Sequence, residues 1–153
     1  KGLFHQKGES GNLPTGEAYL APVEGTANGV AVFDGSFASI GILEEPLKLF
    51  IKDGYVEKIS GGKQAKQLDN LLKPFGKPAY NIAEFGIGTN DKAKLIGKIL
   101  EDEKVKGTIH IALGNNKSMG GSIDVGIHLD GIITKPNVYL DDKLFMKKGK
   151  ILF

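Results

Sequence analysis

The sequence predicts an α+β fold, in which a mainly antiparallel sheet, curled or barrel-like and built from hairpins, carries two packed helices. Asp-Gly dipeptides separate short apolar runs at 34–35 and 53–54, and this dipeptide between apolar runs is typical of a type I′ hairpin turn. Two other segments, 64–72 and 90–103, repeat apolar residues at helical spacing. The 153 residues are the length of one domain.

The apolar runs before and after each turn are expected to pair with each other. Three hairpins are predicted in this way: 29–33 with 36–43, 47–52 with 55–60, and 137–140 with 143–146, which turns again into 151–153. Strands joined by such short turns pair in the antiparallel sense. The chain is therefore expected to be rich in antiparallel sheet.

The two helical segments have recognisable ends. The pattern of 64–72 stops before Pro74, which cannot continue a helix. The longer stripe of 90–103 follows Thr89 and Asn90, either of which is a suitable N-cap. We expect the apolar side of both helices to lie against the sheet.

Composition and charge exclude several classes of function. The net charge is +2 and the charges of both signs are interspersed, so no nucleic-acid partner is expected. No run approaches the roughly 20 apolar residues of a membrane span, and no signal peptide is visible. We therefore expect no membrane partner and a cytoplasmic location. The absence of cysteine excludes disulfides and thiolate metal ligands.

Two histidines and an aspartate in the second half of the chain suggest a metal site. His110 lies in the apolar run 107–114, and His128 and Asp130 lie in a second run. Burying such groups without partners costs roughly 1–3 kcal/mol, so they must be paired or ligated. Residues two apart on a strand share a face, so His128 and Asp130 can hold one ion together with His110 from a neighbouring strand. The alternative for each histidine alone is a hydrogen-bonded core residue.

Two glutamates extend this candidate set. Glu84 lies beside apolar residues just before Gly86, and Glu17 alternates with Tyr19. With the two histidines and the aspartate, they supply enough ligands for one or two first-row divalent ions. Two ions roughly 3.5–4 Å apart form the usual hydrolytic arrangement. The alternative for each glutamate alone is a salt bridge with lysine.

Four motifs, in order, carry a family resemblance: Asn12-Leu-Pro-Thr-Gly-Glu17, Ala83-Glu-Phe-Gly-Ile-Gly-Thr-Asn90, Gly107-Thr-Ile-His-Ile-Ala-Leu-Gly-Asn115 and His128-Leu-Asp130. Together they resemble the catalytic domain of the aminopeptidase T family of metallopeptidases, the thermophilic leucyl-type aminopeptidases. Such relatives carry a further α/β domain in front, and this chain begins with Lys1 rather than Met. Residues 1–153 are thus expected to form a single metal-binding catalytic domain, the C-terminal part of a longer two-domain protein.

The resemblance implies a metal-dependent aminopeptidase, a hydrolase that removes N-terminal residues from peptides through a di-metal centre. It implies two ions of zinc, cobalt or manganese, held by Glu17, Glu84, His110, His128 and Asp130. Either Glu17 or Glu84 would bridge the metals, and the other would act as general base. It also implies a peptide substrate and a homodimer.

One position departs from the peptidase pattern and keeps two alternatives open. The peptidases place a tyrosine ligand seven residues after the first histidine, where this chain has Lys117. A protonated lysine cannot ligate a metal, so we expect Lys117 to turn outward to solvent. A sister branch of the same superfamily is a ring-cleaving dioxygenase of the dihydroxypyridine type, with one Fe(II) held by His110, His128 and Asp130 as a facial triad. The second alternative is a metal-binding domain without turnover.

Overall fold

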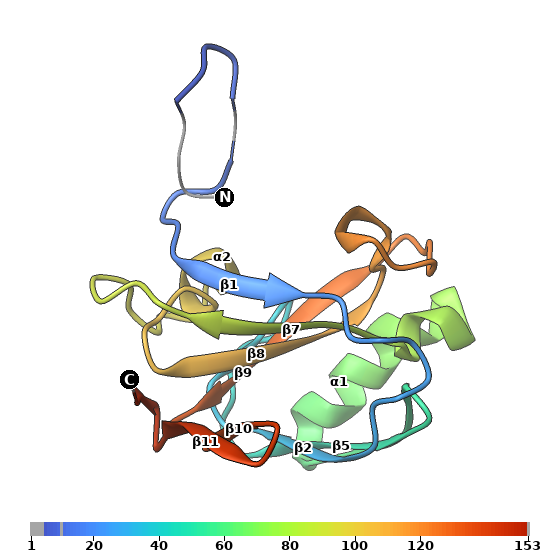
Figure 1. Cartoon of the computed structure of the whole chain (residues 1–153). Helices are drawn as coiled ribbons and strands as arrows, with labels where there is room; N and C mark the ends of the chain where they lie inside the picture. Colours follow the sequence, from blue (N-terminus) through green and yellow to red (C-terminus); the bar gives the residue numbers. More distant parts are fainter. Residues whose placement is uncertain (1–4, 10, 153) are drawn as a thin grey trace.

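Antiparallel sheets form the framework of the computed structural model, which describes residues 5–9 and 11–152 (Figure 1). The largest sheet has six strands in the order β1-β7-β8-β9-β3-β4. Its strands are β1 (Glu17–Leu20), β3 (Ser36–Phe37), β4 (Gly41–Ile42), β7 (Ile82–Gly88), β8 (Thr108–Gly114) and β9 (His128–Thr134). Among the described residues β1 and β4 remain at opposite edges, so this sheet does not close into a barrel. The predicted α+β class with mainly antiparallel pairing is confirmed.

Two three-stranded sheets complete the framework described here. One has the order β2-β5-β6, and the other has the order β10-β11-β12. Their strands are β2 (Gly29–Phe33), β5 (Leu47–Lys52), β6 (Tyr55–Ser60), β10 (Val138–Leu140), β11 (Lys143–Lys147) and β12 (Lys150–Ile151). Two of the three predicted hairpins are therefore confirmed, and only Phe153 of the last run lies outside the described residues.

The predicted hairpin of 29–33 with 36–43 is wrong. β2 pairs with β5, and β3 pairs with β4 and β9. The turn between β2 and β3 is held from β9 instead, because the Asp34 carboxylate accepts hydrogen bonds from the backbone N–H and the hydroxyl of Thr134, at 2.7 and 2.8 Å. The N–H of Gly35 also donates to the carbonyl of Ile132 at 3.1 Å. These long-range bonds turn the chain from one sheet into the other.

Helix α1 (Gly62–Leu72) confirms the first predicted helix and is followed by two short 3-10 turns, η1 (Lys73–Phe75) and η2 (Lys77–Tyr80). The helix packs on β5 and β6, and Figure 1 shows it below the six-stranded sheet. Its Leu68 and Leu72 are fully buried in the main core. On β8, Ile111 and Leu113 contribute to this core. Since side chains alternate along a strand, His110 and Ala112 point to the other face of the sheet.

The second predicted helix is mostly wrong. Only α2 (Ile99–Asp102) is helical within 90–103. Asn90 caps a turn rather than a helix, because its side-chain oxygen accepts from the N–H groups of Lys92 and Ala93, at 2.8 and 3.3 Å. The chain then bends at Gly97, which has a φ of +82°.

The carboxylate of Asp102 stabilises this bend. It is fully buried and accepts hydrogen bonds from the N–H groups of Ile96 and Gly97, at 2.8 and 3.0 Å, and from the Ser36 hydroxyl at 2.5 Å. A side-chain acceptor therefore replaces the backbone acceptors that a helix would provide. The predicted apolar stripe consequently does not cover the sheet, and three of its residues are exposed: Leu95, Ile96 and Leu100.

No helix among residues 5–9 and 11–152 combines the length and the apolar composition that are needed to cross a membrane.

Candidate metal centre

The register of three central strands brings four of the predicted site residues to one face. Glu84 of β7 lies opposite Ala112 of β8, which in turn lies opposite Asp130 of β9. Directly opposed residues share a face, and so do residues two apart on one strand. His110 of β8 and His128 of β9 therefore lie on the same face as Glu84 and Asp130. The fifth residue, Glu17, reaches this face from β1, the neighbour of β7.

Two glycines of β7 make room on this face. A Cβ atom at Gly86 would lie 1.9 Å from Nε2 of His110, so only glycine allows the imidazole to lie over this strand. A Cβ atom at Gly88 would lie 2.0 Å from the carbonyl oxygen of Val105. That glycine therefore allows the segment after α2 to approach the end of β7 closely. Together these glycines bring His110 and the residues around Val105 to the site.

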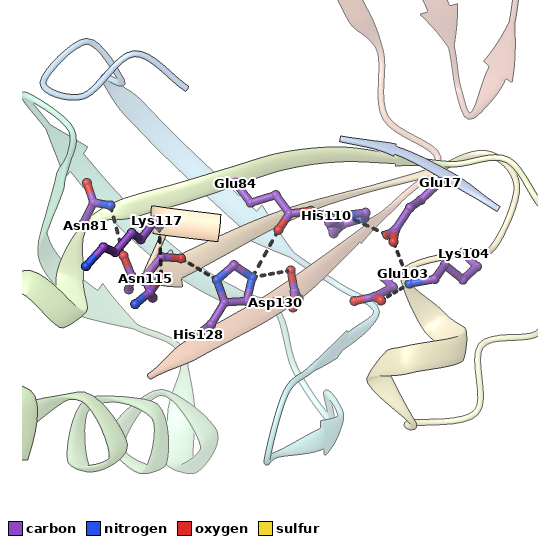
Figure 2. Close-up of polar contacts among 11 residues, drawn as sticks. Glu17, Asn81, Glu84, Glu103, Lys104, His110, Asn115, Lys117, His128 and Asp130 are labelled. Carbon is purple, nitrogen blue, oxygen red and sulfur yellow. Dashed lines mark hydrogen bonds and ion pairs between the residues drawn. The ribbon is translucent and has the colours of Figure 1, made fainter. Parts of the chain in front are cut away.

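Glu84 occupies the middle of the site (Figure 2). One of its carboxylate oxygens lies 3.2 Å from Nε2 of His110, and the other lies 3.1 Å from Nε2 of His128. Nε2 of His128 also lies 3.6 Å from a carboxylate oxygen of Asp130. Glu84 thus joins two imidazoles that come from neighbouring strands.

Glu17 and a buried lysine extend this network away from β9. One oxygen of Glu17 lies 3.5 Å from Nε2 of His110, and its other oxygen lies 2.9 Å from Nζ of Lys104. Lys104 also bonds to the carboxylate of Glu103. Charged groups therefore alternate in sign from Glu84 through protonated His110, Glu17 and Lys104 to Glu103 (Figure 2). Lys104 and Glu103 could not be predicted as part of the site, because a run of charged residues in a sequence is typical of a solvated surface.

The ionisation of the site follows from burial opposed by charge pairing. Burial alone would raise the pKa of Glu84, but hydrogen bonds and charges from His110 and His128 lower it to about 2. Burial alone would lower the pKa of His128, but Asp130 and Glu84 raise it to about 10. Burial likewise opposes protonation of His110, while Glu84, Asp130 and Glu17 raise its pKa. Without a metal the two imidazoles are therefore protonated and paired with carboxylates.

The lysine and its neighbour respond to burial in different ways. Burial alone would lower the pKa of Lys104, but its bonds to Glu103 and Glu17 raise it. Burial raises the pKa of Glu103, and the hydrogen bond from Lys104 opposes this shift only in part. Lys104 is therefore a buried ammonium group close to the candidate metal centre.

Two groups of side chains in the described part of the chain have the composition and spacing of a divalent metal site. In each group, the candidate ligand atoms lie within 4.8 Å of one another. The groups are Glu84, His128 and Asp130, and Glu17, Glu84 and His110. All five predicted ligands thus converge on one site, and their binding of a metal remains a prediction. The alternative triad of His110, His128 and Asp130 does not form a group of its own among these residues.

The imidazole of His128 is oriented by the loop after β8. Its Nδ1 lies 2.7 Å from the backbone carbonyl of Asn115, which leaves Nε2 directed at Glu84 and Asp130. A hydrogen bond of this kind commonly orients a metal-binding histidine. In the same loop Lys117 is exposed and bonds to Asp124 at 2.5 Å. Lys117 therefore turns outward, as expected.

A cavity of about 510 Å³ opens beside the site. Glu84, His128 and Asp130, which form the first of the two candidate groups, line one wall of this cavity. The other lining residues are Asn12, Glu17, Tyr19, Ala38, Ile99, Leu100, Glu103, Asn115, Ser118 and Met119. One side of the cavity is thus charged, and other parts are apolar or aromatic.

Comparisons with known proteins place this site in a family context. The model of the NicX family, described as 2,5-dihydroxypyridine 5,6-dioxygenase, matches residues 1–153. A 2,5-dihydroxypyridine 5,6-dioxygenase of Pseudomonas putida is 26% identical over 164 residues, which cover 99% of this chain and 47% of that relative. A solved structure of 2,5-dihydroxypyridine dioxygenase from Pseudomonas putida has a TM-score of 0.80 at 24% identity, covering 88% of this chain and 42% of that one. The solved structure shows a shared fold, and the chain spans about half the length of these relatives.

These matches correct the family resemblance drawn from the motifs. The aminopeptidase T assignment is wrong, because the matching family model and the sequence relative are dioxygenases. The expected hydrolase activity and the expected peptide substrate are wrong for the same reason. The motifs supply carboxylates and imidazoles that suit several metal-dependent reactions, so they could not separate the two enzyme classes. Lys117, at the position of the peptidase tyrosine, was the sequence signal for the dioxygenase alternative.

Proposed function

The chain belongs to the NicX family of 2,5-dihydroxypyridine 5,6-dioxygenases, and on this premise we propose that it forms the metal-binding catalytic domain of a ring-cleaving dioxygenase. The proposed substrate is a dihydroxypyridine, which is the substrate class in the name of the matching relative. The proposed cofactor is one Fe(II) ion, held by Glu84, His128 and Asp130. Two hydrolytic ions of zinc, cobalt or manganese are not needed for this reaction.

The observation that carries the proposal is the group of Glu84, His128 and Asp130 at the wall of the cavity. Their ligand atoms lie within 4.8 Å of one another, which suits a single ion. The bond from Nδ1 of His128 to the Asn115 carbonyl leaves Nε2 free to bind metal. Two carboxylates and one imidazole are ligand types found around Fe(II) and other first-row divalent ions. These residues therefore fit the ion that the family implies.

Glu84 is proposed as the third ligand in place of His110. Glu84 lies 3.1 Å from Nε2 of His128, whereas His110 groups with Glu84 and Glu17 on the far side. A ligand set with one carboxylate more than the usual facial triad has a more negative charge. In this arrangement His110 holds the Glu84 carboxylate in place through the 3.2 Å contact.

The chain's own residues shape the space for an aromatic substrate. When bound, Fe(II) supplies the redox chemistry and open coordination positions for ring cleavage by oxygen. Tyr19, Leu100 and Met119 give the cavity apolar and aromatic surface that can contact a flat ring and exclude water. The amide of Asn115 and the hydroxyl of Ser118 line the same cavity and can orient the ring hydroxyl groups.

The test is an oxygen-uptake assay on the Fe(II)-loaded chain. We expect 2,5-dihydroxypyridine to lose its ring absorbance while dissolved oxygen is consumed in equal amount. His128→Ala should lose both the metal and the reaction. His5→Ala is the matched control, because His5 is exposed and outside the site. This control should behave like the unmodified chain.

Two outcomes would contradict the proposal. Tight Fe(II) binding with no oxygen uptake would favour a metal-binding domain without turnover. Ring cleavage that survives His128→Ala would mean that the reaction does not depend on the proposed metal group.

A further inference from the structure

Lys104 lies at the inner end of the candidate metal centre, and only 1% of its side chain is exposed. From its position we infer that Lys104 is a positioning residue that holds Glu17 away from the metal and thereby limits the centre to one ion. The inference rests on the proposed function only in placing that ion at Glu84, His128 and Asp130.

The backbone of Lys104 is fixed from two sides. Its carbonyl accepts a hydrogen bond from the N–H of Asn90 at 2.9 Å, and its N–H donates to the carbonyl of Glu101 at 3.0 Å. The missing side chain of Gly88 allows this segment to lie directly on the end of β7, since a Cβ atom there would lie 2.9 Å from the carbonyl carbon of Lys104. The ammonium group is therefore directed into the site by a segment with little freedom to move away.

The two oxygens of Glu17 have different partners. One lies 2.9 Å from Nζ of Lys104, and the other lies 3.5 Å from Nε2 of His110. Glu17 also belongs to the second metal-like group, with Glu84 and His110. That second group shares Glu84 with the proposed iron site, so it has the composition of a second ion site next to the first. Lys104 engages one of its carboxylates.

Charge explains why Lys104 opposes a second ion. The site contains four carboxylates, those of Glu17, Glu84, Glu103 and Asp130. With the Lys104 ammonium, the protonated His110 and one divalent ion, the ionised cluster has no net charge. A second divalent ion would make the cluster positive, and it would lie close to a fixed ammonium in an interior where charges are poorly screened. The Lys104 ammonium thus supplies positive charge that a second ion would otherwise supply to these carboxylates.

The experiment is a titration with Co²⁺ alone. Calorimetry measures how many ions bind and how tightly, and visible absorption reports on the coordination of each ion. The unmodified chain should bind one Co²⁺. Lys104→Met removes the charge and keeps similar volume, so this variant should bind a second Co²⁺. Its affinity for that second ion should be at least about tenfold higher than any weak second binding by the unmodified chain. Lys104→Met combined with Glu17→Gln should return to one ion, because the second group has lost a carboxylate. Lys117→Met is the matched control for an exposed lysine and should bind one ion.

Each result supports or overturns the inference. Two tight Co²⁺ ions in the unmodified chain would overturn it, and so would a folded Lys104→Met variant that still binds one. If Lys104→Met does not fold, Glu17→Gln alone provides the test. It should leave the first ion's absorption spectrum and affinity unchanged, and loss of that ion would show that Glu17 is a ligand. These readouts do not use ring cleavage, so an inactive chain that binds one ion would contradict only the proposed function.

Discussion

Replacing Gly86 by alanine should disrupt the site from the opposite strand. Gly86 lies across from His110, and an added Cβ atom would lie 1.9 Å from Nε2 of that ring. Ordinary contacts between carbon atoms are roughly 3.5–4.0 Å, so the ring must retreat by about 1.5 Å or more. His110 is fully buried, so the ring has no open solvent into which it can turn. Its 3.2 Å contact with Glu84 cannot survive that movement.

The cost can be assembled from three contributions. Overpacking a well-packed interior costs about 1–3 kcal/mol. A hydrogen bond to a charged group contributes about 1.5–3 kcal/mol. Replacing glycine by alanine restricts the unfolded chain, which by itself raises the free energy of unfolding by about 0.4–1 kcal/mol. The free energy of unfolding of the metal-free chain should therefore fall by roughly 2–5 kcal/mol.

Urea denaturation of the metal-free chain measures this change. Gly126→Ala is the matched control, because its added Cβ atom would meet only the ring of Phe75, at 3.2 Å. That ring is 40% exposed and can shift, so the control should change the free energy of unfolding by less than about 0.5 kcal/mol. If Gly86→Ala and Gly126→Ala unfold at the same urea concentration, the close approach of His110 to β7 does not hold this site together.

Four further predictions concern the ionisation of the site and two hydrogen-bonded groups elsewhere in the chain. In the metal-free chain, pairing of His128 and Glu84 stabilises the fold most between pH 4.5 and 6.5. This contribution is lost as pH falls toward the Glu84 pKa of about 2, and as pH rises through the His128 pKa of about 10. Because metal must displace the His128 proton, Co²⁺ affinity should increase with pH over 6.5 to 9, and a flat affinity would contradict this. Asp102→Ala leaves two backbone N–H groups without their acceptor, so the free energy of unfolding measured in urea should fall by about 2–4 kcal/mol. Asp102→Asn keeps an oxygen acceptor and should lose less, and an equal loss in both variants would contradict this explanation. Tyr80→Phe removes the 2.8 Å hydrogen bond to Asp69 and should cost about 0.5–1.5 kcal/mol; a thermal unfolding midpoint equal to that of the unmodified chain would exclude it.

Local pattern predicted the strands that carry the site, because their signal lies within a few residues. The expected run 107–114 corresponds closely to β8 (Thr108–Gly114), and the run that contains His128 and Asp130 corresponds to β9 (His128–Thr134). Alternation along one strand also predicted that His128 and Asp130 share a face, and their side chains lie 3.6 Å apart. Strand partners could not be predicted in the same way. The pairing of β3 with β9 depends on bonds between Asp34 and Thr134, which are 100 residues apart in the chain.

The segment 90–103 shows how local pattern fails. Its apolar spacing is typical of a helix, and helical spacing records only which residues would share a face. It does not show whether a side chain will compete for the backbone donors. Asn90 and Asp102 do compete, and the left-handed φ of Gly97 allows the bend between them. A helix of this length gains little by itself without tertiary packing, so a few such bonds are enough to replace it.

The consecutive residues Asp102, Glu103 and Lys104 explain why part of the site could not be predicted. A run of charges at the end of a predicted helix is typical of solvent, yet all three residues are buried. Asp102 is compensated by the distant Ser36 hydroxyl and by two nearby backbone N–H groups. Glu103 pairs with Lys104, and Lys104 in turn pairs with Glu17 on the edge strand β1. A charge can be buried only where its partner is already held, and that partner is fixed by strand order rather than by spacing along the chain. The candidate ligands were therefore predictable from short motifs. Lys104, the cation that we infer to limit the site to one ion, was not, because its position depends on which elements meet across the sheet.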